Sequence, residues 1–105
     1  MITRHAIFVG RVKAGQEAAM RAYVKAELEP LWRQFACAKE VKVSYGVEQD
    51  PNGPQIPLML AITYEDETGM AAALDSPARY TSRDLLPGFY DRFFEDVTLH
   101  HYVME

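Results

Sequence analysis

The sequence predicts a single α+β domain, with one four-stranded antiparallel sheet covered on one face by helices. The chain has 105 residues, which is the length of one domain. Four stretches show the alternation of strands, and stretches of helical spacing separate the first from the second and the third from the fourth. No internal repeat or low-complexity run interrupts this order, so the elements read strand–helix–strand twice over.

The stretch Arg4–Gln16 predicts a first strand that passes through a glycine turn into a helix. Successive side chains on a strand point to opposite faces. One row is Ala6, Phe8, Gly10 and Val12, and the other is His5, Ile7, Val9 and Arg11. Neither row is wholly polar, so both faces are expected to be covered at least in part. Small residues at 6 and 10 favour close packing of helices on that side, and Gly15 is expected to end the strand.

A first helix is predicted from about Gln16 to Glu29. Its apolar residues fall on one face at helical spacing, namely Met20, Tyr23, Val24 and Leu28. Pro30 is expected to interrupt or end this helix, because proline lacks the N–H donor and clashes with the preceding turn. Leu31, Trp32 and Phe35 then form a short apolar extension.

The second strand is predicted over Glu40–Val47 and the third over Leu58–Tyr64, because both stretches alternate. The segment between them, Gln49–Pro57, holds three prolines, an asparagine and a glycine, which is typical of a loop.

Several helical pieces are predicted next. The first is Thr68–Leu74, and Ser76-Pro77 indicates a restart with an N-cap followed by proline. The restarted helix is expected over Ala78–Leu86 and is expected to stop at Pro87-Gly88, with Phe89–Phe94 as a last turn.

The final strand is predicted over Asp96–Met104, with Val97, Leu99, His101 and Val103 on one face.

Two strand–helix–strand units folded together give the ferredoxin-like βαββαβ arrangement, in which right-handed crossovers place the first and third strands in the centre. Both helices are expected on one face. The other face would show a mixed set: His5, Ile7, Val9, Arg11, Lys42, Ser44, Met59, Ala61, Thr63, His100 and Tyr102. Water would then reach Ile7, Val9 and Met59, so a second copy is expected to cover them in a homodimer.

Composition excludes some classes of function. The net charge is −4 and the pI near 5.3, which argues against nucleic acid as a partner. The single cysteine, Cys37, fits a reducing compartment. No stretch suits a signal peptide or a membrane span, so a cytoplasmic protein without a membrane partner is expected.

Three segments resemble the dimeric α/β-barrel superfamily, in particular its EthD-like and antibiotic-biosynthesis-monooxygenase-like members. Val12-Lys13-Ala14-Gly15-Gln16-Glu17 is similar to a V-K-P-G-x-E turn, with alanine in place of the usual proline. The segment from Ala73 to Arg79 is similar to an "ALxSPE" helix start, and the closing strand carries histidines. The resemblance implies a homodimeric α/β barrel with a pocket between sheet and helices in each subunit. Members include cofactor-free oxygenases, cyclases, isomerases and haem-handling enzymes, and fold analogy does not choose among them.

A second resemblance is to acylphosphatases, through Gly10-Arg11-Val12 and Arg21-Ala22-Tyr23-Val24. The loop lacks the crowded glycines of that family, and the second strand has no asparagine, so this remains an alternative.

The histidines are the first candidates for chemistry. The start of the first strand should lie beside the end of the last, which makes His5 and His100 neighbours with Tyr102 close by. An imidazole that titrates near neutrality suits a general base acting on a phenol or enol. The simpler interpretation is that these histidines lie half in water at the dimer rim. A metal site needs three or more convergent ligands, and His5, His100 and Glu105 match no recognised motif, so neither a metal nor a cofactor is expected.

Aromatic residues are the second candidates. As pocket walls, Trp32, Tyr80, Phe89 and Phe93 would suit a flat aromatic or polyketide-like small molecule, with Arg11 as a further ligand-binding group. As core residues they need no functional explanation. Arg79 and Arg83 are expected to pair with acids at the surface. The function predicted is therefore binding or conversion of such a compound; the alternatives are a non-catalytic dimeric accessory protein, a haem- or metal-binding member and an acylphosphatase-like enzyme.

Overall fold

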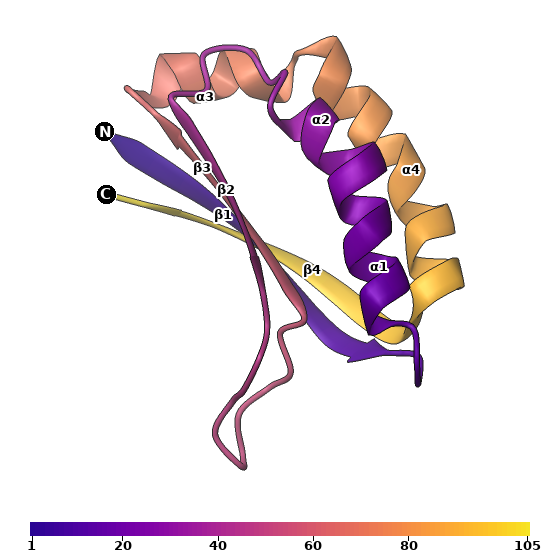
Figure 1. Ribbon diagram of the computed structural model, residues 1–105. Helices are drawn as coiled ribbons and strands as arrows, with labels where there is room; N and C mark the ends of the chain where they lie inside the picture. Colours follow the sequence, from indigo (N-terminus) through magenta and orange to yellow (C-terminus); the bar gives the residue numbers. More distant parts are fainter.

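The computed structural model describes residues 1–105 and shows a four-stranded sheet with helices on one side (Figure 1). The elements in chain order are β1 Ile2–Val12, α1 Glu17–Tyr23, a π-helical segment Val24–Leu28, α2 Glu29–Trp32, β2 Glu40–Tyr45, β3 Leu58–Tyr64, α3 Glu67–Leu74, α4 Pro77–Phe93 and β4 Phe94–Met104. None of these helices combines the length and the apolar character that crossing a lipid bilayer requires.

The sheet has the order β2-β3-β1-β4, and every neighbouring pair is antiparallel. The prediction that the first and third strands lie in the centre is therefore confirmed. The register pairs Ala6 with Leu60 on one side and with His101 on the other, so these three residues share one face of the sheet. One residue along, Ile7 pairs with Met59 and with His100 on the opposite face.

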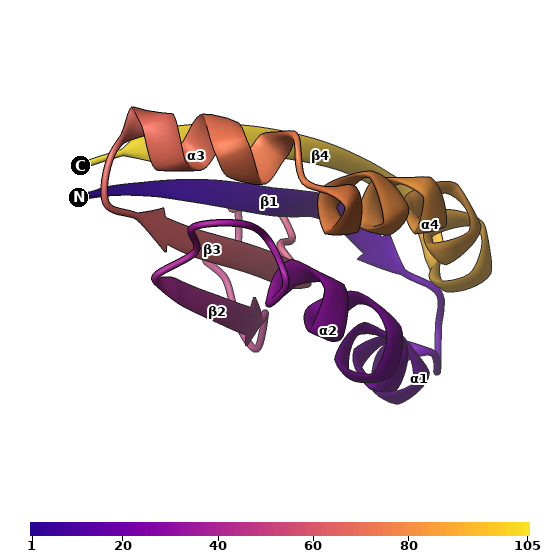
Figure 2. The ribbon, with the colours of Figure 1, turned by 90° about the horizontal axis from the view of Figure 1, so that it is seen from above.

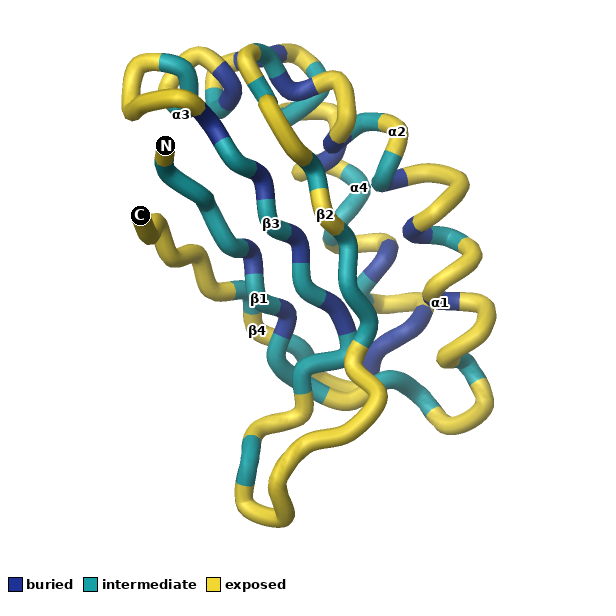
Figure 3. The backbone as a smooth tube through the Cα atoms, turned by 60° about the vertical axis from the view of Figure 1, so that its left-hand side comes forward, coloured by how far each residue is buried: buried dark blue, intermediate teal, exposed yellow.

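The helices pack against only one of these two faces, as Figure 2 shows from above. Every second residue of β3 is buried beneath them, and this alternation is visible along the strand in Figure 3. The residues between are only partly covered, because no helix packs on their side. We name the two sides the helix face, which includes Ala6, Phe8 and Leu60, and the open face, which includes His5, Ile7 and Met59.

The sequence predicts that Pro30 interrupts or ends the first helix, and the structure shows an interruption and not an end. The chain widens into a π-helix over Val24–Leu28 and continues as α2 to Trp32. The N–H of Glu29 donates to the C=O of Val24, five residues back. The wider turn makes room for the proline ring, and Pro30 lies in the first turn of α2, where a missing donor costs little.

Pro87 and Gly88 do not stop α4 either, because the helix runs on to Phe93. A proline inside a helix costs about 3 kcal/mol and a glycine about 1 kcal/mol. The continued helix buries Phe89 and Phe93, each 1% exposed. Full burial of such a side chain stabilises by about 1.5–3 kcal/mol, so the two together offset the cost.

Smaller differences lie at the ends of elements. β2 ends at Tyr45, and Val47 is exposed in the loop that follows. Ser76 precedes α4, yet its hydroxyl donates to the C=O of Ala73 (2.6 Å) instead of capping the helix. Gly10 accommodates the neighbouring strand and not a helix, since a Cβ there would lie 2.1 Å from the carbonyl oxygen of Asp96.

Candidate ligand-binding cavity

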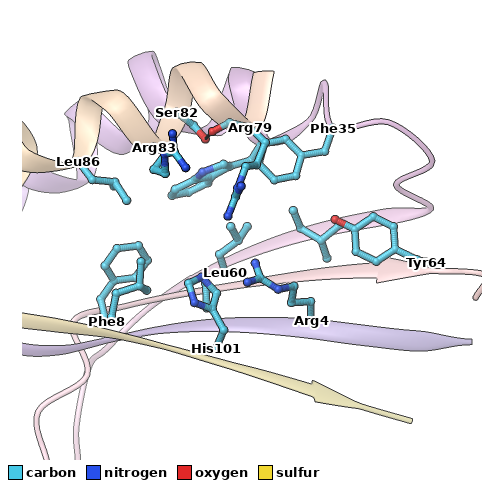
Figure 4. A pocket seen from close by; sticks show the side chains of 14 residues that line it. Arg4, Phe8, Phe35, Leu60, Tyr64, Arg79, Ser82, Arg83, Leu86 and His101 are labelled. Carbon is cyan, nitrogen blue, oxygen red and sulfur yellow. Dashed lines mark hydrogen bonds between the residues drawn. The ribbon is translucent and has the colours of Figure 1, made fainter. Parts of the chain in front are cut away.

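A cavity of about 220 Å³ lies between the helix face of the sheet and helices α2 and α4. Its floor is formed by β1, β3 and β4, and its roof by α2 and α4 (Figure 4). The pairing Leu60–Ala6–His101 runs across the three strands of the floor. Alternation on adjacent strands therefore places every second residue of each strand at this one site.

Most of the cavity wall is apolar. Phe8, Leu60 and Ile62 line it from the sheet, and Trp32 and Phe35 line it from α2 and the turn after it. Trp32 is only 4% exposed, so its indole forms part of both the core and the cavity wall. Leu86 and Leu99 complete the apolar lining from α4 and β4. Such walls suit a flat, largely apolar compound.

The polar groups of the cavity come from three elements. Arg4 projects from β1, His101 from β4, and Arg79 and Arg83 from one side of α4, a single turn apart. Figure 4 shows Arg4 and His101 rising from the sheet toward Arg79 and Arg83 above them. The lining contains no aspartate or glutamate.

Burial and mutual repulsion shape the electrostatics of these groups. Burial, together with the positive charges of Arg4 and Arg79 and the neighbouring His100, lowers the pKa of His101 to about 4. The imidazole is therefore neutral at pH 7. Burial, with Arg79 contributing, also lowers the pKa of Arg4, which stays protonated at any physiological pH. Burial raises the pKa of Tyr64 to about 12, so its phenol is neutral too.

The structure places His5, His100 and Tyr102 on the open face, away from this cavity. His5 pairs directly with Tyr102, and His100 lies two residues along β4 on the same side, so the predicted neighbourhood is present. His100 shares a hydrogen bond of 2.9 Å with the hydroxyl of Thr98. The sequence hypothesis joined these groups to Trp32 in one pocket, and the sheet separates them. Their catalytic role remains a prediction.

Of the five residues predicted to bind ligand, only Trp32 lines the cavity. Phe89 and Phe93 lie in an aromatic core cluster with Tyr23, whose ring is 5.5 Å from each of theirs. Tyr80 is 39% exposed and does not line the cavity; the guanidinium groups of Arg79 and Arg83 lie 5.6 Å and 5.2 Å from the centre of its ring. Arg11 is exposed and pairs with Asp96 (2.9 Å).

The sequence analysis did not select four polar residues that line the cavity, which are Arg4, Arg79, Arg83 and His101. The predicted surface ion pairs of Arg79 and Arg83 are not formed. For His101 the sequence did contain a signal, because strand alternation puts it in the same row as the apolar Leu99 and therefore on the helix face. Nowhere do three or more His, Cys, Asp or Glu side chains gather in a way that could hold a metal ion.

Comparison with known proteins identifies the fold. No family model and no curated protein matches the sequence. Among solved structures, an ethyl tert-butyl ether degradation (EthD) family protein from Bacillus halodurans is similar over 97% of both chains, with 19% identity and a TM-score of 0.69. A dimeric ferredoxin-like protein of unknown function from Thermobifida fusca matches over 98% of this chain and 92% of its own, with 13% identity and a TM-score of 0.62.

A candidate antibiotic biosynthesis monooxygenase from Deinococcus radiodurans is similar over 97% of this chain and 90% of its own, with 18% identity and a TM-score of 0.60. The ferredoxin-like fold and the structural resemblance to EthD-like and monooxygenase-like proteins are thus confirmed. At these identities the likeness concerns the fold and leaves the activity to be argued from the site.

Proposed function

We propose that this protein binds a small, flat and mainly apolar organic compound in the cavity between the sheet and helices α2 and α4. The observation that carries the proposal is the cavity itself, which is walled by Phe8, Trp32 and Phe35 and is lined by only a few polar groups. Binding sites for small molecules are typically concave and apolar with a few polar groups that orient the ligand. The cavity is below the roughly 300–1,000 Å³ of drug-sized sites, which favours a compound of one or two rings.

The chain offers a reporter for this binding, because Trp32 is its single tryptophan and lines the cavity. Titration with a flat neutral compound such as cinnamamide should change the Trp32 emission in a saturable way. The variant Leu99→Phe adds bulk to the cavity lining and should weaken binding at least about tenfold. Val97→Ile enlarges a residue of the same strand and face outside the lining, so it serves as the control. Equal affinity in Leu99→Phe and wild type would contradict the proposed site.

The second part of the proposal is a homodimer formed through the open face. Support comes from the partly exposed Ile7, Val9 and Met59, which no helix covers, and from the dimeric state stated for the Thermobifida fusca protein. Light scattering at micromolar concentration should give the mass of two chains. The mass of one chain at all concentrations would contradict it.

One observation favours a second function, conversion of the bound compound without a cofactor. His101 is a neutral imidazole at the cavity that makes no hydrogen bond or ion pair with another side chain. Such a group can accept a proton from an acidic ligand. If a compound is turned over, His101→Gln should slow its loss, whereas an unchanged rate would leave binding as the function of the cavity.

A further inference from the structure

The cavity concentrates positive charge in a chain that is acidic overall. The chain has 15 Asp and Glu residues against 11 Lys and Arg residues, yet the cavity lining includes three arginines and no acid. Arg4 and His101 come from adjacent strands, where Arg4 pairs with Val103 and His101 with Ala6, which makes them diagonal neighbours on the helix face. Arg79 and Arg83 face them from α4 (Figure 4).

These arginines lack acidic partners such as those of Arg11 and Arg33. Arg11 pairs with Asp96 and Glu95, and Arg33 pairs with Glu29 at 3.2 Å. In the cavity, Arg79 donates only to the backbone oxygen of Leu74 (3.3 Å), and Arg4 has no hydrogen bond or ion pair. A half-buried guanidinium without a carboxylate partner is unfavourable, since burial of a charge costs free energy unless the charge is paired.

A bound anion would relieve the repulsion within this cluster of arginines. Burial and the positive charge of Arg79 lower the pKa of Arg4, and the charges of Arg4 and Arg79 both disfavour a proton on His101. A negative group between them would form charge-assisted hydrogen bonds with the two guanidinium forks, which match a carboxylate in geometry. The neutral imidazole of His101 can add a hydrogen bond from the sheet side.

We infer that Arg4, Arg79, Arg83 and His101 form an anion subsite, and that the ligand class is a small aromatic or similarly flat acid. Its carboxylate, or an equivalent ionised oxygen, lies between β1, β4 and α4, and its apolar body lies against Trp32, Leu60 and Phe8. The inference rests on the proposed function and specifies the charge of the compound that the cavity takes.

The test is a calorimetric comparison of trans-cinnamate with cinnamamide, which has the same shape without the charge. Wild type should bind cinnamate at least about tenfold more tightly at low salt, because hydrogen bonds to charged groups are about twice as strong as neutral ones. In Arg4→Met the ratio of the cinnamate affinity to the cinnamamide affinity should fall toward one. Arg33→Met, which removes an arginine outside the cavity, should leave the preference intact.

The outcomes separate the two proposals. Equal affinities in wild type, or tighter binding of the amide, would overturn the anion subsite and leave the proposed function standing. Failure of both compounds to bind would overturn the proposed function and the subsite together. If Arg4→Met does not fold, as judged by near-ultraviolet circular dichroism, Arg79→Met serves in its place. As an independent readout, the proton NMR titration of His101 should move to higher pH with cinnamate and not with cinnamamide; no movement would also count against the subsite.

Discussion

The two faces of the sheet differ more in their surroundings than in their composition. On the helix face, Phe8 is 2% exposed and Leu60 is 6% exposed, and the space left between them and the helices is the cavity. On the open face, Ile7 and Met59 are just as apolar but only partly covered. One face builds the core and borders the cavity, and the other is the face that we propose binds a second chain.

The largest effect should come from truncating neighbours on opposite faces of β1. Phe8→Ala is expected to lower the free energy of unfolding by about 3–5 kcal/mol, because it leaves a void in the buried core. Ile7→Ala should cost markedly less in the isolated subunit, because its side chain is only partly buried. Urea denaturation at several protein concentrations measures both. Equal losses in the two variants would contradict the assignment of core and interface.

A charge on the open face should break the dimer and spare the fold. Met59→Lys is expected to weaken dimerisation about a hundredfold or more, because the ammonium would be buried without a partner. Sedimentation velocity measures the change. The control is Lys42→Met, which removes a positive charge at an exposed position of the same face. A dimer of wild-type strength in Met59→Lys would mean that the open face is not the interface.

The pH dependence of stability should come partly from His101. Its pKa is about 4 in the folded chain, below the value of about 6.5 expected when unfolded. The unfolded chain therefore binds more protons between these values, so stability falls as the pH is lowered from about 6.5 to about 4. The charged groups that line the cavity with His101 are Arg4, Arg79 and Arg83, and His100 is its neighbour along β4.

Replacing the imidazole tests this contribution. In His101→Gln the loss of thermal stability between pH 7 and pH 4.5 should be smaller than in wild type, as measured by the unfolding midpoint. His100→Gln on the open face is the control. Parallel curves for His101→Gln and wild type would show that the imidazole of His101 does not contribute.

The smallest effect should come from the predicted catalytic residues of the open face. His100→Ala is expected to change cinnamate affinity by less than about twofold, because the sheet separates His100 from the cavity. Calorimetry measures it. A large loss of binding, or of turnover where turnover is found, would support the predicted catalytic role of His5, His100 and Tyr102.

Sequence reasoning succeeded where local pattern decides structure. Alternation gave β3 its bounds, Leu58–Tyr64, and placed the two rows of β1 on their faces. It failed at Pro87, because tertiary burial of Phe89 and Phe93 outweighs the local preference to end a helix. Local rules carry no information about how much surface a longer helix buries.

The site was predicted less well than the fold. Trp32 was selected for its chemistry and does line the cavity. The placing of His5 near His100 and Tyr102 followed from topology, but these residues lie on the face of the sheet opposite to Trp32 and the cavity. Arg4, Arg79 and Arg83 meet only when the strand register and the position of α4 are both known. Whether these arginines have acidic partners depends on which residues lie near them in the folded chain, and local sequence patterns do not give this.

Native mass spectrometry tests the central claim most directly, because one spectrum reports both subunit number and bound ligand. The claim is that the helix face binds a small acid while the open face binds a second chain. Wild type mixed with cinnamate should have the mass of two chains with bound ligand. Under the same conditions Met59→Lys should have the mass of one chain with bound ligand, and Leu99→Phe should have the mass of two chains without ligand. Simultaneous loss of partner and ligand in either variant, or a wild type that is a bare single chain, would contradict the account.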